Sequence, residues 1–102
     1  MQKLNRATNR TLDSRKNTEL EMKSLLDRLN QKIAAQSLKM RTDEANPDMD
    51  SIDLMNQLKL VRTKTQYFLE DLQDPYFEQW DEQLPTMRLV FEQGEKLLTI
   101  PN

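Results

Sequence analysis

The side chains that most often carry catalysis are missing from this sequence. It contains no His and no Cys, so the commonest general base, the commonest metal ligand and the usual thiol nucleophile are all absent. With a single Gly in 102 residues, a glycine-rich phosphate-binding loop is also excluded. We therefore expect a protein that is not an enzyme and that needs no cofactor.

Carboxylates are plentiful, and the densest set is Glu78, Asp81 and Glu82. Helical spacing would place them on one exposed flank, where they could bind a divalent cation weakly or take part in acid–base chemistry. A solvated acidic helix face explains the same pattern, and we favour that interpretation. The segment 43–50 is as acidic as a calcium-binding loop, but it lacks the glycine and the final bidentate Glu that such a loop needs. We expect an acidic connector there and no metal site.

Basic residues are concentrated near the N-terminus. Residues 1–17 contain five basic residues and one acidic residue, whereas residues 18–102 contain ten and sixteen. Lys3, Arg6 and Arg10 could contact the phosphates of a nucleic acid or of an acidic membrane. Against this, no aromatic residue is interleaved for base stacking, and no apolar face is present for insertion into a membrane. We expect residues 1–17 to form a frayed or disordered basic arm, and its binding role is the less favoured hypothesis.

The elements that would position these groups are helices, because three stretches repeat their apolar residues at steps of three and four. The stripes are Met22, Leu26, Leu29, Ile33 and Met40; then Leu54, Leu58, Val61, Phe68 and Leu72; then Phe77, Trp80, Leu84, Met87, Phe91 and Leu98. No stretch alternates apolar and polar residues as a half-buried strand would. The sequence predicts an all-α protein, an antiparallel three-helix bundle or coiled-coil-like hairpin with helices at about 18–41, 50–73 and 75–98.

Capping signals set these boundaries. Thr18 followed three residues later by Glu carries the spacing of a capping box, and Asp50 is a plausible second cap. Asp74 before Pro75 predicts the start of the third helix. Pro85 then falls inside that helix, where it removes one backbone hydrogen bond and costs about 3 kcal/mol. Either the third helix is kinked near Pro85 or a new helix begins there; we favour the kink, because the apolar phase continues unbroken.

Leu60 and Tyr67 are large side chains that the predicted core does not need. They are two turns apart on one side of the second helix, which makes them our candidate docking patch for another protein. Trp80 and its aromatic neighbours fall on the predicted seam, so we interpret them as core residues.

Together these features favour a non-catalytic interaction module, a small helical subunit or adaptor domain that binds other proteins through its helical faces. A helical chaperone or co-chaperone that shields a client helix is the first alternative. A nucleic-acid or acidic-membrane accessory that acts through Lys3, Arg6 and Arg10 is the second. The same stripes could close within one chain or swap helices between two copies. Without a long apolar run or an apolar leader, we expect an intracellular protein, cytoplasmic by default.

Overall fold

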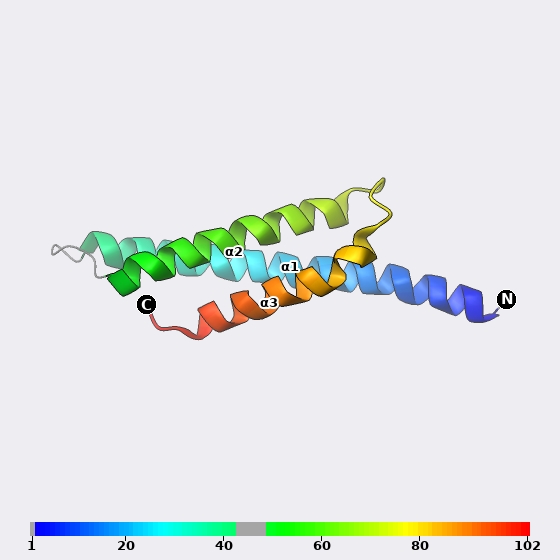
Figure 1. Ribbon diagram of the computed structural model, residues 1–102, viewed down its shortest axis with the longest axis horizontal. Coiled ribbons are helices and arrows are strands. Elements are labelled where there is room, and N and C mark those ends of the chain that lie inside the picture. The colour runs from blue at the N-terminus through cyan, green and yellow to red at the C-terminus, as the bar shows by residue number, and fades with distance from the viewer. Residues whose placement is uncertain (1, 43–48) are drawn as a thin grey trace.

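The structure is an all-α, antiparallel three-helix bundle, which confirms the predicted fold class (Figure 1). The computed structural model describes the backbone of residues 2–42 and 49–102, and the side chains of residues 15–42 and 49–102. Helix α1 spans Gln2–Thr42, α2 spans Met49–Gln73 and α3 spans Leu84–Thr99. One turn of 3₁₀-helix, η1 (Trp80–Gln83), precedes α3. Most of the predicted acidic connector, residues 43–48, lies outside the described residues.

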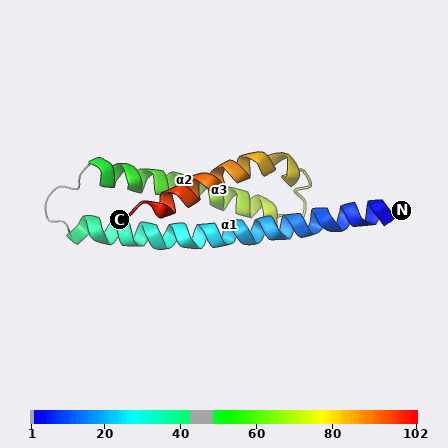
Figure 2. The same cartoon turned by 90° about the horizontal axis from the view of Figure 1, so that it is seen from below.

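The three helices differ strongly in length, which gives the molecule its elongated shape of 66 × 23 × 17 Å. At about 1.5 Å per residue, α1 is roughly 62 Å long, α2 roughly 37 Å and α3 roughly 24 Å. Figures 1 and 2 show α2 running back along α1, and α3 returning in the direction of α1. The N-terminal part of α1 extends past the ends of both other helices.

Helix α1 begins far earlier than the sequence signals predict. The capping pattern at Thr18 predicted a helix start, but α1 passes through this residue without a boundary. The backbone of residues 2–17 is therefore part of α1. The reason is that no Gly or Pro interrupts the chain before Pro47, so a Thr suited to capping does not by itself stop the helix.

The core contains the predicted stripes and several adjacent residues. The buried apolar side chains are Met22, Leu25, Leu29, Ile33, Leu54, Met55, Leu58, Val61, Leu69, Leu72, Trp80, Met87, Val90 and Leu97. Leu25 is fully buried whereas the predicted Leu26 is only partly buried, and Val90 is buried more deeply than Phe91. Each helix of a three-helix bundle faces two partners, so its apolar face must be wider than the two-position seam of a coiled coil.

The third helix is shorter than predicted, and the prediction that it starts near residue 75 was wrong. Residues 75–79 form turns in place of a helix, and the α-helix begins at Leu84 with Pro85 in its first turn. Asp74 does not cap a helix; its Oδ1 accepts a hydrogen bond from the backbone N–H of Tyr76 (3.0 Å), which closes a local turn. The α-helix thus starts beside Pro85, directly after the 3₁₀ turn, where a first-turn proline loses no hydrogen bond.

Two polar side chains are buried in the seam, and they are satisfied differently. The Thr65 hydroxyl donates to the carbonyl of Val61 one turn earlier (2.8 Å), so it needs no partner from another helix. Gln36 Nε2 donates to the carbonyl of Ser51 (3.1 Å), but its Oε1 is buried and has no partner among the described residues. An unpaired buried acceptor of this kind costs about 1–3 kcal/mol.

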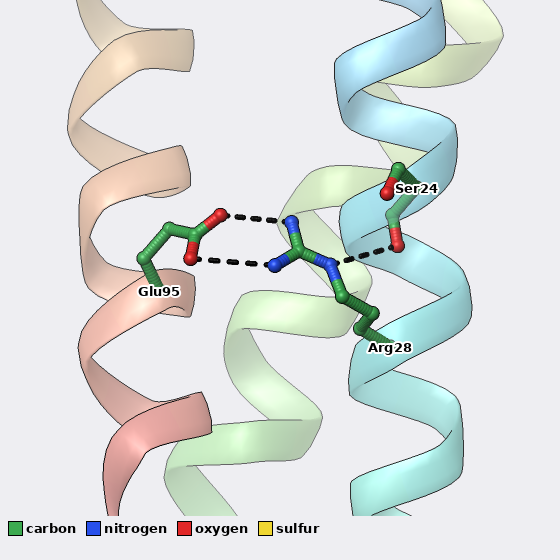
Figure 3. Close-up of polar contacts among 3 residues, drawn as sticks. All are labelled: Ser24, Arg28 and Glu95. Atoms are coloured by element: carbon green, nitrogen blue, oxygen red, sulfur yellow. Dashed lines mark hydrogen bonds and ion pairs between the residues drawn. The ribbon is translucent and has the colours of Figure 1, made fainter.

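An ion pair connects α1 to α3 at mid-length. Arg28 donates two hydrogen bonds to the carboxylate of Glu95, at 2.8 and 3.3 Å, and a third to the carbonyl of Ser24 at 3.4 Å (Figure 3). The paired geometry is compatible with the observed rotation of α3 relative to α1. Since both side chains remain about 40% exposed, the pair contributes at most about 1 kcal/mol to stability.

Gly94 lies where α3 packs closely against α1. A Cβ atom at this position would lie 2.7 Å from Leu25 Cδ1, which is closer than two carbon atoms can pack. We predict that Gly94→Val lowers the free energy of unfolding by about 1–3 kcal/mol, because the fully buried Leu25 would have to move. Urea denaturation measures the change. The control is Gln93→Val, which adds the same side chain at an exposed neighbour; equal losses in both variants would contradict the prediction.

Candidate functional site

The outer face of α2 exposes four large apolar side chains. The predicted patch residues Leu60 and Tyr67 are 56% and 64% exposed, and Met49 and Ile52 on the same helix are 79% and 37% exposed. From Met49 to Tyr67 the positions follow helical steps of three and four, so the four residues share one face. That face lies opposite the buried stripe of α2, which includes Leu58 and Thr65.

This face carries no charge over most of the helix. Exposed Asn56 and Thr63 occupy the turns between the apolar residues, and the Thr63 hydroxyl donates back to the carbonyl of Lys59 (3.0 Å). We name the six residues Met49, Ile52, Asn56, Leu60, Thr63 and Tyr67 the outer face of α2. Charged side chains such as Lys59 and Lys64 stand beside it. An uncharged strip with charged edges is the usual layout of a helix that packs against a second helix.

A shallow hollow lies at the C-terminal end of the outer face. It has a volume of about 220 Å³ and is lined by Thr63, Gln66, Tyr67 and Glu70. The ring of Tyr67 thus borders a concave surface, which a partner side chain could fill.

The structure keeps Leu60 and Tyr67 on one accessible face and adds two residues that our sequence reasoning missed. Met49 and Ile52 were overlooked because we counted only the pair two turns apart. Their signal was present, since Ile52 lies eight residues before Leu60 and Met49 eleven, and both distances return to the same side of a helix. Other exposed apolar residues are Leu20 and Leu38 on α1, Leu89 on α3, and Tyr76 and Ile100 outside the helices.

The basic arm is divided by the structure. Lys3, Arg6 and Arg10 belong to the part of α1 that extends beyond α2 and α3 (Figure 2), and their side chains lie outside the described residues. Arg15, in contrast, is not available to a partner. Its Nε donates to the carbonyl of Leu72 (3.1 Å), and its Nη2 donates to the carbonyls of Asp74 (2.7 Å) and Asp71 (3.5 Å).

Arg15 therefore caps the C-terminus of α2 from a neighbouring helix. The last carbonyls of a helix have no partner within it and carry partial negative charge, so a guanidinium is a suitable cap. The sequence gives no sign of this role, because Arg15 and Leu72 are 57 positions apart.

Glu78, Asp81 and Glu82 are all exposed, as a solvated acidic flank would be. Among the residues whose side chains the structure describes, 15–42 and 49–102, no three acidic side chains lie close enough together to hold a metal ion. In the same part of the chain, no helix combines the length and the apolar character that crossing a bilayer requires.

Comparisons of this chain with protein family models, with curated proteins and with solved structures found no match. Function is therefore argued from the residues and their geometry.

The cap at Arg15 leads to a stability prediction. Replacing Arg15 with Met keeps the aliphatic stem and removes the three hydrogen bonds, so the free energy of unfolding should fall by about 1–2 kcal/mol. Thermal or urea unfolding followed by circular dichroism measures the loss. Lys16→Met, at the exposed next position, should have almost no effect; a similar loss in both variants would show that helix composition and not the cap is responsible.

Proposed function

We propose that this chain is a non-catalytic interaction module, a small helical subunit or adaptor domain that binds a helix of another protein on the outer face of α2. One observation carries the proposal: α2 is apolar on two opposite faces, and the contacts with α1 and α3 cover only one of them. An apolar strip on an exposed helix face is typical of a protein–protein contact.

The spacing of the outer face favours a helix as the partner element. Its six residues repeat at steps of three and four over five turns, which is how a helix presents anchors to another helix. Leu60 and Tyr67 supply the large anchors, and the smaller Thr63 between them permits close approach. Because these positions are uncharged, binding there would not bury an unpaired charge.

The chaperone alternative uses the same surface and differs in the state of its partner. A chaperone would bind the isolated or unfolded client helix, whereas a subunit or adaptor would bind the folded partner. Binding of the same partner in both forms, measured by isothermal titration calorimetry, separates the two roles.

The partner could also be a second copy of this chain. Sedimentation equilibrium over a wide concentration range reports the oligomeric state directly. Self-association that is lost when the outer face of α2 is altered would assign that face to a homodimer.

Our main prediction concerns the double variant Leu60→Asp with Tyr67→Asp. It should weaken partner binding by more than about tenfold, because two apolar anchors that the complex would bury become charged. Helicity and thermal stability should be unchanged, since neither residue packs in the core.

The matched control is Leu38→Asp with Leu89→Asp, which introduces two charges at equally exposed leucines on α1 and α3. The measurement is affinity for the partner identified by photocrosslinking from position 60 in the otherwise unchanged chain. Unchanged affinity in the first double variant, or equal losses in both, would remove the outer face of α2 from consideration.

The proposal assigns no partner to the basic part of α1. Replacing Lys3, Arg6 and Arg10 with Gln should therefore leave binding to a DNA duplex or to anionic vesicles unchanged across a salt series. If the segment contacts phosphates, the slope of log K against log salt should instead fall by about 0.9 for each contact removed on duplex DNA. The substitutions must stop before Arg15, because deleting residues 1–17 would also remove the cap on α2.

A further inference from the structure

The outer face of α2 is accessible over its whole length. All six of its residues are exposed, and it lies opposite the buried stripe that packs against α1 and α3. From Met49 to Tyr67 it is about 27 Å long at 1.5 Å per residue. A second helix of that length could therefore lie along the face without displacing either neighbouring helix.

The spacing along the middle of this face is the same in both directions. Met49, Asn56, Leu60 and Tyr67 follow one another at intervals of seven, four and seven residues. Two antiparallel copies of α2 that overlap fully would place Met49 opposite Tyr67 and Asn56 opposite Leu60, once on each side of a two-fold axis. A symmetric dimer requires a self-complementary surface of this kind. The spacing therefore allows α2 to pair with itself in the antiparallel direction.

Charged residues beside the outer face match in the same arrangement. Asp50, Asp53 and Lys64 are exposed, and their helical positions put all three on one edge of the face. Within one chain Lys64 lies 11 residues from Asp53, about 16 Å along the helix, so the two side chains cannot pair. When two copies run antiparallel about a two-fold axis, equal edges meet. Lys64 of each copy then falls level with the segment between Asp50 and Asp53 of the other.

A parallel pair of the same helices would be less favourable. Each residue of the face would meet its own counterpart, so Asp53 would lie near Asp53 of the second copy. Opposite edges would also meet, which would bring Lys59 of one copy beside Lys64 of the other. Charges at the edges of a helix pair set its orientation, and here they select the antiparallel one.

We propose that, in the chain on its own, the outer face of α2 is covered by the same face of a second copy. The two helices run antiparallel, with Lys64 of each copy beside Asp50 and Asp53 of the other. The proposal rests on the proposed function, because it assumes that this face binds a helix, and it names the helix that occupies the face until another protein displaces it. Self-association then competes with the partner for one surface, so it regulates partner binding.

Lys59 distinguishes the antiparallel pair from a non-specific effect of charge. It is exposed on the opposite edge of the face, and its position near the middle places it close to Lys59 of the second copy. Removing this charge should therefore strengthen self-association, whereas removing the charge of Lys64 should weaken it. The same substitution at two lysines five residues apart gives opposite effects only if equal edges meet.

The test is sedimentation equilibrium of the full chain up to about 1 mM, at low salt, where surface charges are least screened. We expect a monomer–dimer equilibrium. Lys64→Gln should lower the association constant about threefold, and Lys59→Gln should raise it about twofold. Leu60→Asp with Tyr67→Asp should abolish the dimer. Circular dichroism should show unchanged helicity in every variant, since all the altered residues are exposed.

Charge reversal tests the contact itself. Lys64→Glu and Asp53→Lys should each lower the association constant more than about tenfold alone, and an equimolar mixture of the two variants should associate again, because opposite charges then face each other. The proposal is overturned if the mixture does not associate, if both glutamine variants change the association constant in the same direction, or if the dimer survives Leu60→Asp with Tyr67→Asp. A chain that stays monomeric but still binds the partner crosslinked from position 60 also overturns it, and leaves the proposed function standing.

Discussion

Burial of the seam between α1 and α2 is the constraint on which the rest of the structure depends. Only 36% of the residues are apolar, so stability must come from narrow stripes that are covered on every side. Two helices alone would leave one edge of each stripe in water, and α3 covers that edge. With 16 residues against 25 in α2, α3 cannot cover it completely. Trp80 extends the cover at one end, and at the other end the cover stops with α3 at Thr99.

The position of α3 follows from contacts that the apolar stripes do not specify. Gly94 lets the backbone of α3 come close to Leu25 on α1, and the Arg28–Glu95 pair adds a polar contact between the same two helices. Arg15 closes the carbonyl end of α2, just before the chain turns toward η1. All three contacts join segments more than 50 residues apart. These contacts select one arrangement of the third segment on the α1–α2 hairpin, which its apolar residues alone would not define.

Periodicity was sufficient to predict the helices, their order and most of the core, because each stripe is long and regular. Periodicity could not decide which of Leu25 and Leu26 is buried, since either residue continues the pattern of three- and four-residue steps. The position of α3 selects Leu25. The predicted start of α3 was wrong. The apolar spacing continues across Pro85, but this spacing does not require an α-helix throughout, because turns and a 3₁₀ segment also place Trp80 in the core. For the candidate site, exposure of Leu60 and Tyr67 followed from the phase of α2, whereas the role of Arg15 required three-dimensional contacts.

A polar residue can interrupt an apolar stripe for different structural reasons, as the buried residues Thr65 and Gln36 show. Thr65 bonds within its own helix, so it requires nothing from outside and can be explained as part of the core. Gln36 uses the nitrogen of its amide to hold the first turn of α2, and the amide oxygen is buried without a partner among the described residues. A leucine at position 36 would fill the stripe without that cost. What the glutamine contributes, and a leucine could not, is the hydrogen bond to the carbonyl of Ser51, which joins the first turn of α2 to α1.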